Sequence, residues 1–83
     1  MSNFSKPLRS NQHTYNLSFS KVESMTTHKY FVTISDNYKA LSAFEMKQNS
    51  KGEWKIVLPA PDYILKEEGL LSSWIINERN AIV

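Results

Sequence analysis

Lys47 and Lys55 are the residues whose type and spacing come nearest to a binding chemistry. They flank a turn at residues 49–52, and the register predicted below places them opposite each other on the outer face of a β-hairpin. Like charges in directly opposed positions destabilise a sheet, and an anion such as phosphate relieves the repulsion. Glu45 and Glu53 lie on the same face at the diagonals, so a solvated patch of alternating charge is the competing interpretation. Lys47 and Lys55 are the candidate anion contacts.

Phe31 adds an aromatic side chain to the same predicted outer face, together with Thr33 and Val57. An exposed sheet with an aromatic residue beside lysines is typical of proteins that stack nucleic-acid bases. The sequence lacks the Lys/Arg-Gly-Phe-Gly-Phe run and the βαββαβ order of the RNA-recognition motif. Weak nucleic-acid binding through this face and a basic N-terminal tail is therefore the alternative function. The simpler interpretation places Phe31 beneath the tail or in a dimer contact.

Side chains that carry out catalysis or bind metals are sparse. His13 and His28 have no carboxylate or cysteine at a recognised spacing, and the chain has no cysteine, which excludes a disulfide and a thiolate metal site. Glu67 and Glu78 fall on a similar side of the predicted helix, but glutamates at the border of an apolar stripe normally reach water. With only two glycines, the chain has no phosphate-binding loop. We predict no catalytic residue, no metal site and no cofactor, and a protein that is not an enzyme.

The segment from residue 44 to residue 58 predicts a β-hairpin whose register follows from parity. The apolar side chains that must share the inner face, Phe44, Met46, Trp54, Ile56 and Leu58, are at even positions. Even-numbered residues must therefore pair with even-numbered residues. A three-residue loop at residues 50–52, closed by Asn49 and Glu53, gives this parity. It also places Asn49 at the start of a type I turn and Gly52 in its left-handed position. The implied pairs are Gln48 with Trp54, Met46 with Ile56, and Phe44 with Leu58.

Two earlier strands join the hairpin. Residues 15–20 alternate apolar and polar side chains, and the alternation can continue through Val22. Residues 29–35 are rich in β-branched and aromatic side chains, and a turn leads from them into a third strand over residues 40–48. The apolar phase changes within this third strand, and a β-bulge near Ala43 would reconcile its two halves. The inward side chains of the first two strands are predicted to be Tyr15, Leu17, Phe19, Tyr30, Val32 and Ile34.

The C-terminal part of the chain predicts one helix with two apolar sides. Pro59 and Pro61 end the last strand, since neither can donate a backbone hydrogen bond, and the helix is expected to begin at the second proline or the residue after it. The main stripe consists of Tyr63, Ile64, Leu70, Leu71, Trp74 and Ile75. Leu65 and Ile76 lie together on a helical wheel, away from this stripe, and are predicted to contact a partner. Gly69 could instead divide the segment into two helices.

Assembled in order, these elements predict an α+β fold: an antiparallel four-stranded β-meander with one C-terminal helix packed on one face. The predicted domain covers residues 14–83. Residues 1–13 show no apolar period and are predicted to be a disordered tail, with docking of Phe4 and Leu8 on the domain as the alternative. An 83-residue chain buries a small core, so a second subunit is one route to further stability.

The scarcity of catalytic residues, the small core and the exposed sheet edges favour an interaction module. We predict a small non-enzymatic domain that binds another protein or itself, with Leu65, Ile76 and Phe31 as contact residues. The net charge is only +2, although residues 1–40 hold five basic and two acidic side chains. No apolar run reaches the ~18–20 residues that span a bilayer, and the N-terminus lacks the apolar centre of a signal peptide. A cytoplasmic location without membrane contact is expected.

Overall fold

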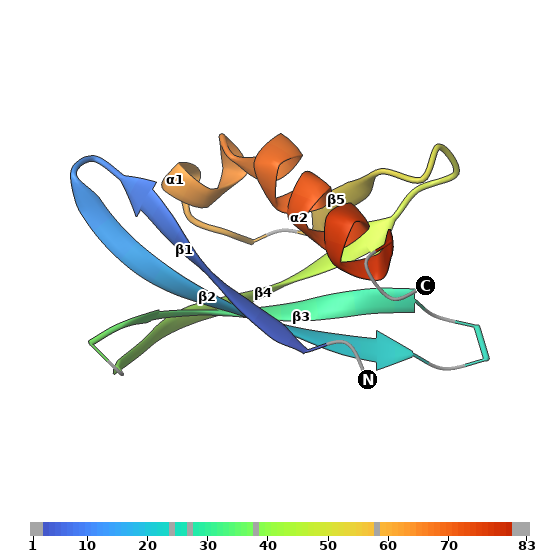
Figure 1. The fold of residues 1–83 in the computed structure, drawn as a ribbon, viewed down its shortest axis with the longest axis horizontal. Helices are drawn as coiled ribbons and strands as arrows, with labels where there is room; N and C mark the ends of the chain where they lie inside the picture. Colours follow the sequence, from blue (N-terminus) through green and yellow to red (C-terminus); the bar gives the residue numbers. More distant parts are fainter. Residues whose placement is uncertain (1–2, 24, 27, 38, 58, 81–83) are drawn as a thin grey trace.

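The computed structural model describes residues 3–23, 25–26, 28–37, 39–57 and 59–80. Its strands form one antiparallel sheet in the order β1-β2-β3-β4-β5. They span Phe4–Ser10 (β1), His13–Glu23 (β2), His28–Asp36 (β3), Lys39–Gln48 (β4) and Trp54–Val57 (β5), and helices α1, Asp62–Leu65, and α2, Glu68–Asn80, follow. The sheet curls around the two helices, which lie on its concave side (Figure 1). The predicted α+β class is thus confirmed, with five strands instead of four.

Strand β1 corrects the prediction of a disordered tail. Residues 4–10 pair along β2, with Phe4 opposite Phe19 and Leu8 opposite Tyr15. The Phe4 ring stacks on the Phe19 ring at a centroid distance of 4.5 Å, and only 2% of Leu8 is exposed. The alternative that Phe4 and Leu8 dock on the domain is therefore correct. Lys6, which lies between them on the same strand face, interrupts the apolar alternation and hides the strand from a pattern search.

The turn between β1 and β2 explains why this hairpin is hard to recognise. Asn11 and Gln12 both have a positive φ, of 53° and 64°, as a two-residue type I′ turn requires. Asparagine adopts this conformation readily, but glutamine does so rarely, and glycine is the usual second residue. The turn therefore depends on strand pairing as well as on its own residues.

Strands β2, β3 and β4 supply most of the core. The predicted inward residues of β2 and β3 are buried, except that Tyr15 is half-buried. The bulge lies two residues earlier in β4 than predicted, because Ile34 pairs with Ser42 while Ser35 pairs with Ala40, which leaves Leu41 as the extra residue. Residues 39–43 are all exposed, so the first half of β4 has no inward apolar side to match.

The hairpin formed by β4 and β5 has the predicted register. Gln48 pairs with Trp54 and Met46 pairs with Ile56, whereas Leu58, the predicted partner of Phe44, lies outside the described residues. Gly52 has a φ of +84°, in the left-handed region that glycine adopts without strain. The Asn49 Oδ1 atom accepts hydrogen bonds from the backbone N–H groups of Lys51 and Glu53, each at 2.9 Å. The turn residues and the apolar pattern therefore favour the same pairing.

The predicted single helix is two helices, separated at residues 66–67. Gly69 is not the breaking residue, because it lies inside the first turn of α2. Of the predicted stripe, Ile64, Leu71 and Ile75 are buried, Tyr63 and Trp74 are half-buried, and Leu70 is 41% exposed. The interruption changes the angular phase between the two helices, so one helical wheel cannot describe both.

Trp54, on the inner side of β5, is the largest fully buried side chain of the described residues. Its indole meets the Tyr30 ring edge-on at a centroid distance of 5.2 Å. The guanidinium carbon of Arg79, in the last turn of α2, lies 5.7 Å from the indole centroid, within the range of a cation–π contact. At the opposite end, the Tyr63 ring stacks on the Tyr15 ring at 4.7 Å. These contacts hold the helices against one face of the sheet, and neither described helix lies on the other face.

Candidate interaction surface

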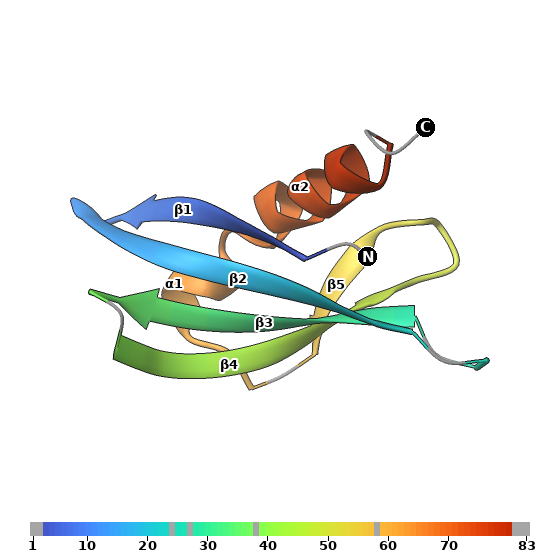
Figure 2. The same ribbon diagram turned by 60° about the horizontal axis from the view of Figure 1, so that its bottom comes forward.

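The outer, convex face of the sheet carries three exposed apolar side chains, Val22, Phe31 and Val57, which we call the outer patch. Figure 2 shows this face in front, with the helices behind the strands. All three side chains are exposed, and Phe31 is the most exposed of them at 42%. In the register, Phe31 lies opposite Glu45, and Glu45 lies opposite Val57, while Val22 lies one row away. The pairing of four strands thus gathers side chains that are far apart in the sequence.

A row of three lysines continues across the outer face from Val22, which pairs with Lys29. Lys29 pairs with Lys47, and Lys47 pairs with Lys55, so the three side chains cross β3, β4 and β5 in one line. We call them the lysine row. The predicted opposition of Lys47 and Lys55 is confirmed, and Lys29 is the member that the sequence did not reveal. Lys29 can be assigned to the row only when the register between β3 and β4 is known. The bulge at Leu41 shifts that register by one residue.

Two lysines of the row have ion-pair partners. The Lys29 Nζ atom donates to Glu45 Oε2 at 2.9 Å, and Lys55 Nζ lies 3.5 Å from Glu68 Oε1. Lys47 makes no ion pair in the part of the chain that the structure describes. The hydrogen bond from Lys29, with the positive charges of Lys29 and Lys47, holds the pKa of Glu45 below its usual value. Lys47 is therefore the cation of this row that is placed to meet an external anion.

A hollow of about 270 Å³ lies beside Lys47 at the end of the sheet. We call it the end hollow, and its walls are Thr26, His28, Lys47 and Gln48. The His28 Nδ1 atom is 3.1 Å from Glu23 Oε2, which fixes the orientation of the ring. Every residue in these walls carries a polar side chain, so the hollow can receive a polar or charged group.

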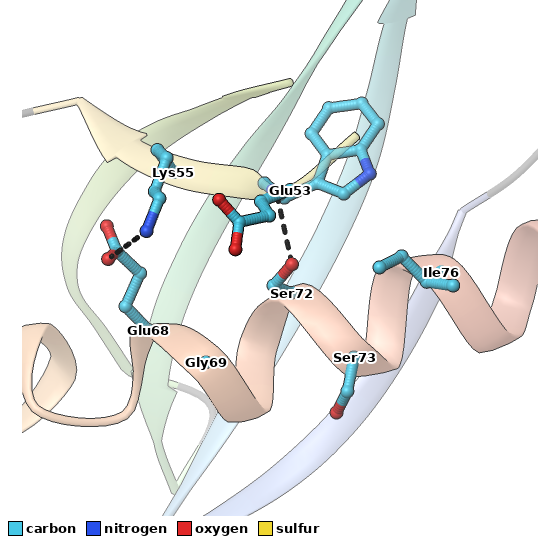
Figure 3. Close-up of a pocket in the computed structure, with 8 residues that line it drawn as sticks. Glu53, Lys55, Glu68, Gly69, Ser72, Ser73 and Ile76 are labelled. Atoms are coloured by element: carbon cyan, nitrogen blue, oxygen red, sulfur yellow. Dashed lines mark hydrogen bonds and ion pairs between the residues drawn. The ribbon is translucent and has the colours of Figure 1, made fainter. Parts of the chain in front are cut away.

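A second hollow, of about 260 Å³, lies between β5 and α2 (Figure 3). Ile76 contributes to its wall and is exposed, as predicted for a surface residue. Leu65 is half-buried on α1 and lies outside this wall. Because the chain is interrupted between α1 and α2, a single helical wheel does not apply to both Leu65 and Ile76. Ile76 lines the observed hollow, and Leu65 does not.

The same region closes the free edge of β5. The Trp54 N–H donates to Ser72 Oγ at 3.0 Å, and the Ile56 N–H donates to Glu68 Oε2 at 2.8 Å. Figure 3 shows Ser72 and Glu68 reaching from α2 toward the strand. These side chains occupy the donors that an added strand would need. Strand addition at β5 is therefore blocked.

The other edge of the sheet is protected by Pro7 in β1. Ser10 and His13 close the two-residue turn as a cross-strand pair, and backbone groups alternate in direction along a strand. Counting back from Ser10, the backbone of Pro7 faces the free edge, where proline offers no N–H group. The exposed edges expected from the sequence are thus both guarded, and association by edge pairing is disfavoured.

Each histidine has a carboxylate neighbour that sequence spacing did not reveal. His13 Nε2 lies 2.9 Å from Asp36 Oδ2, across the ends of β2 and β3, and His28 contacts Glu23 as described above. Only the pairing of β2 with β3 brings these residues together. Ser10, the cross-strand neighbour of His13, has a buried hydroxyl that makes no hydrogen bond, so no nucleophile–base pair is assembled there. Among the described residues, no group of three or more metal-ligating side chains occurs.

Comparison with known proteins assigns neither a family nor a function. No protein-family model, no curated protein and no solved structure matches the chain. None of the described helices has the length and apolar character to cross a membrane. The surface chemistry of the sheet is therefore the basis for a functional proposal.

Proposed function

We propose that this protein is a small interaction module that binds another protein through the outer face of its sheet. The observation that supports this is the outer patch, in which three apolar side chains lie exposed on a face without a helix. Apolar patches bordered by charged residues are typical of protein-binding surfaces. Here the charged neighbours are the lysine row and Glu45, which lies between Phe31 and Val57.

Both edges of the sheet are protected against strand addition, so the outer face is the surface at which we expect a partner to bind. Ser72 and Glu68 close the edge at β5, and Pro7 interrupts the edge at β1. A partner that adds a strand would have to displace helix contacts at one edge or leave unpaired groups at the other. A partner that covers Phe31 needs no such change.

Phe31→Asp is expected to abolish capture of the partner. The protein, tagged and used as bait in an extract of its native host, would be compared with the variant by quantitative mass spectrometry. We expect the specific partner to fall more than tenfold, because a central interface aromatic typically contributes 2 kcal/mol or more. Leu70→Asp is the matched control, since Leu70 is equally exposed, at 41% against 42% for Phe31, but lies on α2. Capture of the same proteins by wild type and by Phe31→Asp would refute the proposal.

Self-association is a second part of the proposal, and exposed Ile76 on α2 supports it. Sedimentation equilibrium is expected to give a mass that rises with protein concentration above that of the monomer. Ile76→Asp should return the mass to the monomer value, because a charge in an apolar contact is poorly solvated. A monomer mass at all concentrations, unchanged by the substitution, would remove this part of the proposal.

Weak nucleic-acid binding is the second candidate function, and the position of the lysine row beside Phe31 favours it. A polyphosphate backbone requires several available cations, and such binding weakens steeply with salt. Two of the three lysines already have carboxylate partners. For that reason we place protein binding first.

A further inference from the structure

We infer that the partner presents a carboxylate to Lys47 and an apolar side chain to Phe31, on an extended acidic segment. This inference rests on the proposed function and adds the chemistry of the partner. It is carried by the charges of the outer face, by the end hollow and by the spacing of the two residues.

Lys47 is the lysine of the row that can contact an external anion, because the other two lysines have carboxylate partners. Lys29 is hydrogen-bonded to Glu45, and Lys55 is paired with Glu68. Lys47 lies between these two lysines in the register, and like charges in opposed positions repel. A carboxylate from a partner would relieve this repulsion and form a charge-assisted hydrogen bond.

The end hollow gives that carboxylate a place. Its volume of about 270 Å³ exceeds the ~30 Å³ that one water molecule occupies in the liquid, so an aspartate or glutamate side chain fits. Gln48 also borders the hollow, but its Nε2 atom already donates to the Gly52 carbonyl at 3.2 Å. Lys47 is thus the strongest donor that the hollow offers to an incoming acid.

The spacing of Lys47 and Phe31 matches an extended chain. Phe31 pairs with Glu45, so Lys47 lies one strand away and two residues along. Strand geometry places the two Cα atoms about 8 Å apart, while alternate residues of an extended segment, which point to the same side, are about 7 Å apart. A segment with an acidic residue at position i and an apolar residue at position i+2 can therefore meet both.

The shape of the face favours a segment over a second sheet. The outer face is convex, because the sheet curls toward the helices (Figure 1). Two convex sheets touch over a small area, whereas an extended segment can follow the curvature. Glu45 and Glu53 near the row repel any anion, and this repulsion is larger for a backbone of repeated phosphates than for a single carboxylate held at Lys47.

A phage-displayed random peptide library, panned against the full chain, tests the inference. We expect enrichment of peptides with Asp or Glu two positions from an aromatic or aliphatic residue. An enriched peptide, resynthesised, should bind Lys47→Ala about tenfold more weakly than wild type, since a charge-assisted hydrogen bond is lost. Lys39→Ala is the matched control, because Lys39 is an exposed lysine of the same strand, about 25 Å away by strand geometry.

The other outcomes separate the inference from the proposed function. Peptides that depend on Phe31 but bind Lys47→Ala as well as wild type would overturn the inference and leave the proposed function standing. Enriched peptides insensitive to both residues, or no enrichment, would overturn both. Stronger binding of an oligouridylate at ~50 mM salt, lost in Lys47→Ala and steeply reduced by added salt, would replace the protein partner with a nucleic acid.

Discussion

Leu8→Asp is expected to destabilise the protein by about 3–5 kcal/mol, because it removes a buried side chain and places a charge in the core. A domain of this size has about 4–12 kcal/mol of total stability, so much of the variant should be unfolded at 25 °C. Urea denaturation followed by tryptophan fluorescence measures the loss, since Trp54 is buried in the core and becomes exposed on unfolding. This substitution tests the assignment of residues 4–10 as an integral strand.

Arg9→Asp is the matched control for Leu8→Asp. Arg9 is the next residue of β1 and is exposed, so the same aspartate there should change the free energy of unfolding by less than about 0.5 kcal/mol. If both substitutions were equally mild, β1 would not be packed on β2 as described. If only Leu8→Asp is severe, the alternation of buried and exposed side chains in β1 is established.

The double variant Glu68→Ala, Ser72→Ala is expected to lower the free energy of unfolding by about 3–5 kcal/mol. Each single change leaves a backbone N–H of β5 without its acceptor, at about 1–3 kcal/mol apiece. The affected donors are the N–H groups of Trp54 and Ile56. Loss of Glu68 also removes the ion pair with Lys55. The opened edge should further increase aggregation, measured by light scattering.

Amide hydrogen exchange gives a local measurement for the same variant. The Trp54 and Ile56 amides should lose more protection than the amides of β2, because their acceptors are the deleted atoms. Ser73→Ala is the control, since the Ser73 hydroxyl donates its hydrogen bond to the Leu70 carbonyl within α2, not to a group of β5. Unchanged exchange at Trp54 and Ile56 would show that α2 does not close this edge.

The hairpin of β4 and β5 was predictable because its information is local. The apolar side chains that it turns inward share one parity, and the loop between them contains a glycine at the position that needs a positive φ. Only one register satisfies both conditions. The opposition of Lys47 and Lys55 follows from that register without any knowledge of the rest of the fold.

Strand β1 and the helix break were not predictable in the same way. The inward-facing Lys6 and the turn Asn11-Gln12 obscure β1, which is defined by its pairing with β2. The residues at 66–67 include no proline or glycine, so nothing in their local propensity marks the break. Packing of two short helices against a curled sheet decides where the chain turns.

The candidate surface was also predictable only in part. The sequence by itself determined that Phe31, Lys47 and Lys55 lie outward, because strand alternation assigns each residue to a face. The tertiary structure decided that Lys29 completes the row and that Val22 joins the patch, because strand pairing brings distant residues together. It also decided that Glu68 neutralises Lys55, and this contact leaves Lys47 as the cation for a partner. A pattern within one strand is local, whereas an ion pair between a strand and a helix exists only after the two have packed.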